Sequence, residues 1–135
     1  MAEINSSSPY AHGPQNVTGI MMAVVYALIP ATIAYAWLFG PGVLFNIGIA
    51  TGVALMAEAA VLAWRKAPVR PALSDGSALV TALLLGLALP PLSPWWLTTV
   101  GILFAIVIAK QLYGGLGFNP FNPAMVGYVA LLISF

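Results

Sequence analysis

The stretch Tyr113-Gly-Gly-Leu-Gly-Phe-Asn-Pro-Phe-Asn-Pro-Ala124 separates two apolar segments and decides how the C-terminal part of the chain folds. It holds three glycines and two Asn-Pro pairs. A residue before proline is pushed away from helical geometry, so we expect the chain to break at Asn119 and again at Asn122. Asn122 then fits a helix N-cap, and Pro123 the first residue of a new helix. Such non-helical backbone survives at membrane depth only when it is buried in protein or lines a cavity.

The composition of the whole chain is that of a membrane protein. Of its 135 residues, 61% are hydrophobic and 5% are charged, whereas soluble domains are roughly 25% charged. The apolar runs are continuous rather than alternating, which favours helices over a barrel. A net charge of +1 gives no argument for nucleic acid, and the lack of Cys excludes thiolate metal sites and disulfides within this chain. We expect neither a metal site nor catalytic residues here.

The hydrophobic runs predict an all-α integral membrane protein with about five membrane helices. An arm over 1–17 should lie in the cytoplasm; its His12 is expected to be a surface residue, the alternative being a contact with a partner or cofactor. A membrane domain over 18–135 follows. The expected helices cover about 18–39, 43–64, 77–89, 95–112 and 123–135. Because the third is shorter than the roughly 20 residues of a full span, it either crosses or re-enters the membrane. The last run stops inside apolar sequence, so we expect either an N-terminal portion of a longer protein or an unusually short final helix.

The few charged side chains suggest an orientation. Arg65, Lys66 and Arg70 form the one cationic cluster, and the positive-inside rule places their loop, and the N-terminus two spans earlier, in the cytoplasm. Lys110, at the end of the fourth helix, is expected at the same face if the third segment crosses the membrane, and at the opposite face if that segment re-enters. Gly48 and Gly52 have GxxxG spacing, which favours a closely packed helix face.

Two carboxylates are candidates for an ion pathway. Glu58 lies within an apolar span, where a charge is costly and is often functional; alternatively it pairs with Arg65 or Lys66 near the interface. Asp75 precedes the helix expected from Ser77 and could lie at the mouth of a buried cavity. The alternative is that Asp75 and Ser74 simply cap that helix.

Four ordered blocks of sequence resemble the D subunit of the bacterial Rnf complex, a family homologous to the B subunit of the sodium-pumping NADH:quinone oxidoreductase. The blocks are 74–84, 89–96, 104–117 and 119–128. The resemblance implies a multi-pass subunit of a multi-subunit, redox-driven ion translocase in the bacterial inner membrane. Such a complex exchanges electrons between ferredoxin and NAD, which act through other subunits, and moves Na⁺ or H⁺. This chain would hold no complete active site and would form the first half of a ten-helix, two-repeat, transporter-like fold.

The resemblance also implies flavins. The family carries FMN on a threonine in a later motif that is absent here, and it holds riboflavin without a covalent bond near an Asn-Pro-x-Asn-Pro loop. Asn119 and Asn122 match that loop, and Gly115, Gly117 and Phe118 adjoin it. A carboxamide can donate to and accept from a flavin edge, and glycine lets the ring approach the backbone. Alternatively, Asn122 only caps a helix and Asn119 only orders the turn.

Two functions of other classes stay open from the residues alone. One is a channel or permease half with a urea- or ammonium-transporter-like fold and no redox role. The other is a structural scaffold for flavin-bearing neighbours. A bound flavin is the feature that separates the redox subunit from the permease.

Overall fold

The computed structural model describes residues 16–115 and 117–135, which contain helices and loops and no strand. The all-helical class is therefore confirmed for this part of the chain, whereas His12 lies outside it. The elements in order are α1 (Val17–Phe39), α2 (Gly42–Trp64), α3 (Val69–Ser74), α4 (Ser77–Ala88), α5 (Trp95–Leu103), the π-helix η1 (Phe104–Gln111) and α6 (Pro123–Ser134).

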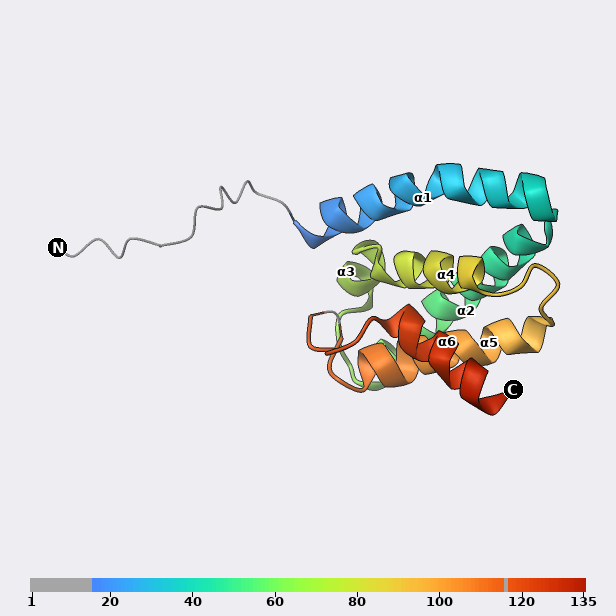
Figure 1. Cartoon of the computed structure of the whole chain (residues 1–135). Helices are drawn as coiled ribbons and strands as arrows, with labels where there is room; N and C mark the ends of the chain where they lie inside the picture. Colours follow the sequence, from blue (N-terminus) through green and yellow to red (C-terminus); the bar gives the residue numbers. More distant parts are fainter. Residues whose placement is uncertain (1–15, 116) are drawn as a thin grey trace, which may run out of the picture.

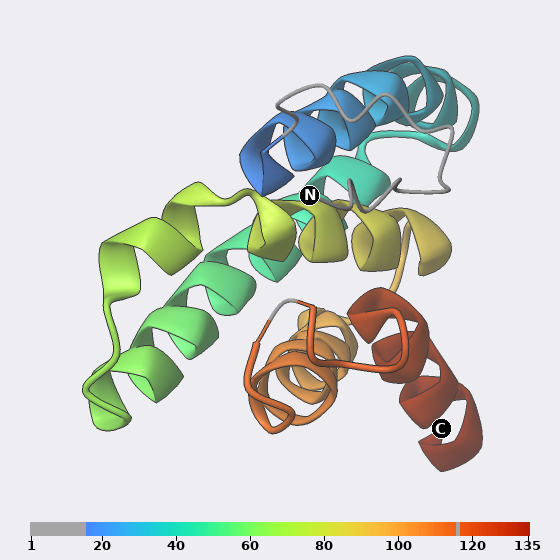
Figure 2. The same cartoon turned by 90° about the vertical axis from the view of Figure 1, so that its left-hand side faces the viewer.

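Two helices, α1 and α2, are long and apolar enough to cross a membrane, with 23 residues each. Asn16 caps α1 by accepting a 2.8 Å hydrogen bond from the amide of Gly19, and Gly40, with φ of 90°, ends it. No residue of α1 is buried. This helix lies at the edge of the bundle, and α4 separates it from α5 and α6 (Figures 1 and 2).

The centre of the bundle is the pair α2 and α4. Ala50 and Ala54 of α2 are buried in one core with Ala78 and Ala82 of α4, and small side chains of this kind let two helices approach closely. The helices are antiparallel, because the amide group of Asn46 early in α2 donates to the carbonyl of Pro90, which follows α4, over 2.9 Å. The opposite end of α4 lies beside the late part of α2.

The second packed pair is α5 and α6. A Cβ added to Gly127 of α6 would lie 2.5 Å from the carbonyl oxygen of Gly101 in α5, so the two backbones touch. The hydroxyl of Thr98 donates over 3.3 Å to Asn46 and ties α5 to α2. The C-terminal Phe135 packs edge-on against Trp96, with ring centroids 5.2 Å apart.

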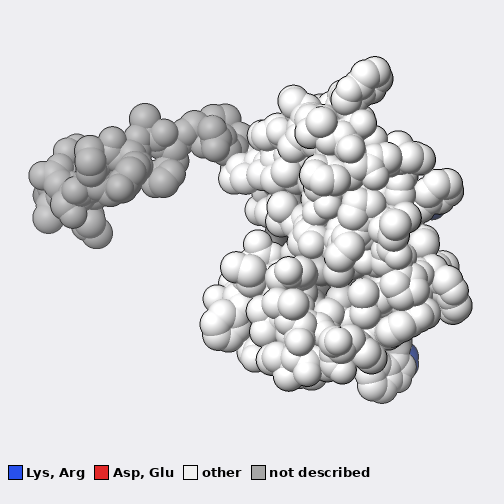
Figure 3. Space-filling model, turned by 45° about the vertical axis from the view of Figure 1, so that its right-hand side comes forward, with Lys and Arg blue, Asp and Glu red and all other residues white. Residues whose placement is uncertain are grey.

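The two ends of the bundle differ in composition. The end formed by the α1–α2 turn and the loop before α5 exposes Trp37 and Trp95, whereas the opposite end exposes Arg65, Lys66 and Arg70 beside Trp64. The face shown in Figure 3 is almost free of charged residues. Aromatic and cationic ends around an apolar middle are typical of helices embedded in lipid.

The predicted glycine face of α2 is wrong for the part of the chain described. Gly48 and Gly52 are exposed, and a Cβ added to either would have no neighbour within 4 Å. Close backbone contacts lie instead at Gly86, where an added Cβ would be 3.1 Å from the Cα of Ile47, and at Gly127. The GxxxG spacing marks small residues, but the buried stripe of α2 runs along a different face of the helix.

We expect Gly127→Ala to destabilise the protein, because the added methyl group must push α6 away from α5. Overpacking of this kind costs about 1–3 kcal/mol. Gly48→Ala is the matched control, because it makes the same change within a helix with no neighbour to displace; it should be neutral or stabilise by up to about 1 kcal/mol. Thermal denaturation of the purified full-length protein in detergent measures both, and equal effects of the two substitutions would contradict the packing described.

Candidate functional site

Glu58 lies in the interior of the bundle and is 1% exposed. Together with Ala50, Ala54 and Leu62 it forms a buried stripe along α2, with one member every four residues. Residues at this spacing share one helix face, and this face is covered by α4 and η1. The predicted pairing of Glu58 with Arg65 or Lys66 is wrong, because both of those side chains lie beyond the end of α2 and are exposed.

The partner of Glu58 is Lys110 of η1, which is also 1% exposed. Its ammonium group forms an ion pair with Glu58 Oε1, and Gln111 Nε2 donates to the same oxygen over 2.9 Å. Lys110 therefore points into the bundle rather than outward at the end of its helix, and the side of the membrane on which it lies stays a prediction. Lys110 turns inward because the bundle holds a buried carboxylate that needs a counter-charge.

The π-helical turn explains why two consecutive residues reach one carboxylate oxygen. The amide of Leu112 bonds to the carbonyl of Val107 over 2.9 Å, which is the i→i+5 pattern. This turn is wider than that of an α-helix, so successive side chains diverge less around the axis. Short π-helical segments occur frequently at functional sites.

The break between α3 and α4 supplies the third side of the site. Gly76 adopts a left-handed conformation with φ of 79°, and Asp75 Oδ1 accepts from the amide of Ser77 over 2.8 Å and from its hydroxyl over 2.6 Å. Asp75 thus binds the first amide of α4, as expected. Ser74 does not cap α4, because its hydroxyl donates to the carbonyl of Arg70 over 2.7 Å.

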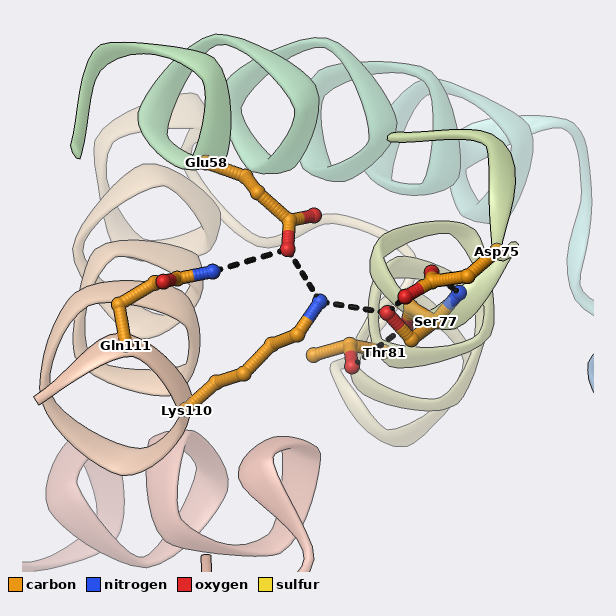
Figure 4. Close-up of polar contacts among 6 residues, drawn as sticks. All are labelled: Glu58, Asp75, Ser77, Thr81, Lys110 and Gln111. Atoms are coloured by element: carbon orange, nitrogen blue, oxygen red, sulfur yellow. Dashed lines mark hydrogen bonds and ion pairs between the residues drawn. The ribbon is translucent and has the colours of Figure 1, made fainter. Parts of the chain in front are cut away.

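These contacts connect the two carboxylates predicted for an ion pathway (Figure 4). Lys110 donates to Glu58 and to the hydroxyl of Ser77, and that hydroxyl donates to Asp75. The chain of hydrogen bonds leads from a fully buried carboxylate to a partly exposed one. We call Glu58, Asp75, Ser77, Lys110 and Gln111 the Lys110 network.

One atom of the network is unsatisfied within the described part of the chain. Glu58 Oε2 is buried and has no hydrogen-bond partner. A buried acceptor left without a partner costs about 1–3 kcal/mol, and more for a charged group. The carboxylate therefore has one oxygen held by Lys110 and Gln111 and one that can still accept.

A cavity of about 220 Å³ adjoins the network. Its walls come from α1, α4, the end of η1 and the start of α6, and are formed by Met21, Ser77, Val80, Thr81, Leu84, Lys110, Asn122 and Pro123. Lys110 and Ser77 line the cavity, whereas Glu58 does not. Because Lys110 also binds Glu58, its side chain lies between the cavity and the buried carboxylate.

The loop before α6 forms a second candidate site. Asn122 Oδ1 accepts from the amide of Ala124 over 2.9 Å and caps α6, and Asn119 Nδ2 donates to the carbonyl of Phe121 over 2.6 Å. Each carboxamide thus has a local structural role. The Nδ2 group of Asn122 and the Oδ1 atom of Asn119 remain available to a ligand.

An apolar groove of about 670 Å³ runs beside this loop. Pro120, Asn122 and residues of η1 and α6 line it. Its volume lies within the range of about 300–1,000 Å³ found for small-molecule sites, and its walls are apolar except for one carboxamide. Gly115, Gly117 and Phe118 lie in the preceding loop and do not line the groove. Gly115 and Gly117 have φ values of 107° and 89°, which favour glycine.

Sequence reasoning missed Lys110, Gln111 and Ser77 as site residues. One signal could have found Lys110. Within the predicted membrane helices, Glu58 and Lys110 are the two ionisable residues other than tyrosine, and opposite charges inside a membrane bundle usually pair with each other. No comparable signal in the sequence predicts the role of the Ser77 hydroxyl or the π-helical turn.

Comparison with known proteins agrees with the resemblance. Residues 4–135 match the model of the NQR2, RnfD, RnfE family. Proteins named as the D subunit of an ion-translocating oxidoreductase complex are 60% identical in Yersinia pseudotuberculosis, 56% in Citrobacter koseri and 55% in Colwellia psychrerythraea. Each alignment covers 96% of this chain and 37% of the relative, so the chain spans little more than a third of the relatives' length. The resemblance to the Rnf family is confirmed, and this chain belongs to the NQR2, RnfD, RnfE family.

Proposed function

We propose that this chain is part of a membrane subunit of a redox-driven ion translocase and that the Lys110 network lies on its ion pathway. The observation that carries the proposal is the buried pair of Glu58 and Lys110. Ionisable residues inside a membrane bundle are rare and mark ion or proton pathways. The relatives are named as parts of an ion-translocating oxidoreductase complex, which favours this function over a permease half.

The helix break at Gly76 supports an ion pathway at this position. α4 has 12 residues, or about 18 Å of helix, and it begins beside the buried network rather than at the end of the bundle. In transporter folds, discontinuous helices of this kind form ion sites near the middle of the membrane. We propose that α1, α2, α4, the α5–η1 pair and α6 make five spans and form the first repeat of a two-repeat fold.

We place the complex in the bacterial inner membrane, with the N-terminus and the loop carrying Arg65 and Lys66 in the cytoplasm. The cationic end of the bundle supports this orientation. The partners proposed for this chain are membrane lipid and the other subunits of the complex, which would in turn meet ferredoxin and NAD. FMN bound to a threonine would belong to a later region of the full-length protein.

We extend the proposal to a non-covalent riboflavin in the apolar groove. When bound, the flavin would supply the electron-transfer chemistry, and the groove would exclude water from it. Asn122 would donate its Nδ2 group to an acceptor on the ring edge while its Oδ1 atom caps α6. Asn119, Gly115, Gly117 and Phe118 do not line the groove; they would act indirectly, through the loop that positions Pro120 and Asn122.

For the ion pathway, Glu58→Gln is the decisive change. Glutamine keeps the shape and an acceptor for Lys110 but removes the charge that attracts a cation. In liposomes that contain the complete complex, we expect the number of ions moved per electron to fall severalfold, because the neutral side chain no longer binds the cation. Arg65→Gln is the control and should leave this ratio unchanged. Normal coupling in an assembled Glu58→Gln complex would exclude Glu58 from the pathway.

For the flavin, the informative variant is Asn122→Ser. Serine is as good an N-cap as asparagine, so α6 should keep its stability while the Nδ2 donor is lost. We expect the amount of non-covalent flavin extracted by acid from the purified complex to fall several-fold, and to fall likewise in Asn119→Leu. Asn16→Leu removes the corresponding cap from α1 and controls for loss of a cap. Unchanged flavin content in both loop variants would remove the loop from the site.

A further inference from the structure

We propose that Lys110 is a built-in counter-ion that a transported monovalent cation displaces from Glu58. This inference rests on the proposed ion pathway and describes how a cation would bind at Glu58. In the structure the ammonium group of Lys110 neutralises Glu58 through its Oε1 atom, and a transported cation would take over the same negative charge. Lys110 and the cation would therefore compete for one carboxylate.

The charges of the network require that the competitor be monovalent. Glu58 carries one negative charge and Lys110 one positive charge, so the buried pair is neutral. Burying an unpaired charge is strongly unfavourable, so a cation that replaces Lys110 must carry a single positive charge. A divalent ion would leave an excess charge inside an apolar bundle.

The atoms around Glu58 suit such a cation. Glu58 Oε2 is buried and unpartnered among the described residues, so one ligand atom is available before Lys110 moves. Ser77 contacts Lys110 and Gln111 contacts Glu58, and each of these residues carries a side-chain oxygen. Oxygen donors of this kind are the ligands that hard cations prefer. A proton can equally neutralise the carboxylate, so Na⁺ and H⁺ are the two candidates for the cation that displaces Lys110.

The displaced ammonium group of Lys110 can move into the neighbouring cavity. Lys110 lines the cavity of about 220 Å³ together with Ser77 and Thr81. Asp75, a second carboxylate, is one hydroxyl away, because Ser77 Oγ accepts from Lys110 and donates to Asp75. One ammonium group is thus shared between two carboxylates, and a cation on Glu58 would shift it towards Asp75.

This competition sets the apparent affinity for the cation. When a site is available for only a fraction of the time, the apparent dissociation constant rises by the reciprocal of that fraction. If Lys110 occupies Glu58 about nine-tenths of the time, its removal should tighten cation binding about tenfold. Lys110 would then keep the affinity of the site for the cation low enough for the ion to be released.

The test is Lys110→Gln in the complete complex, with Na⁺ as the probe and choline as the control cation. Without Lys110, Glu58 must take its counter-charge from solution. We expect the Na⁺ concentration that half-saturates electron transfer to fall about tenfold. We also expect Na⁺, but not choline, to restore the thermal stability that the variant loses. Lys66→Gln is the matched control, because Lys66 is exposed, and it should change neither quantity.

Ser77→Ala provides a second variant if Lys110→Gln assembles poorly. It removes the hydroxyl that links Lys110 to Asp75, and one proposed oxygen ligand of the cation, without changing any charge. Lys110 should then stay on Glu58, so the half-saturating Na⁺ concentration should rise. If H⁺ is the exchanged ion, both variants should instead leave the Na⁺ dependence unchanged and move the pH profile of turnover.

Two results separate failure of this inference from failure of the ion pathway. If Glu58→Gln alters ion coupling but Lys110→Gln and Ser77→Ala shift neither the Na⁺ dependence nor the pH profile, Lys110 is only a structural partner. If Glu58→Gln also leaves ion coupling intact, the network is not on the ion pathway at all.

Discussion

A carboxylate buried in an apolar bundle must find its counter-charge inside the bundle, and this requirement organises the centre of the protein. Glu58 on α2 is matched by Lys110 on η1, and Lys110 in turn holds Ser77 at the start of α4. Three segments far apart in the sequence therefore converge on one ammonium group. Removing either member of such a buried pair leaves an uncompensated charge, which is far more costly than losing a surface ion pair.

The side chains of the Lys110 network are positioned at two places where the backbone departs from a regular α-helix. The left-handed Gly76 ends α3 and lets Asp75 bind both the amide and the hydroxyl of Ser77. The π-helical turn of η1 directs Lys110 and Gln111 together towards Glu58. Both irregularities thus lie beside the buried charge and bring its partners to it.

Features that depend on local chemistry could be predicted from the sequence. Continuous apolar runs predicted the helical class, and the Asn-Pro pair at Asn122 predicted the cap of α6, which the structure confirms. Features that depend on which helix faces meet could not be read in this way. Lys110 looked like an interfacial flank, and Gly48 looked like a packing residue, because the direction of a side chain around a helix is decided by the neighbouring helices. The flavin loop and the five-span topology stay predictions.

The central claim is that Glu58 and Lys110 stabilise the bundle as a pair, and a double-mutant cycle on the full-length protein tests it most directly. The free energy of unfolding would be measured for Glu58→Gln, Lys110→Met and the double variant. We expect Lys110→Met alone to cost about 3–5 kcal/mol and the double variant to be more stable than the sum of the single effects predicts, by about 2 kcal/mol. The control cycle of Glu58→Gln with Lys66→Met should be additive. Additivity within about 0.5 kcal/mol for Glu58 and Lys110 as well would contradict the account.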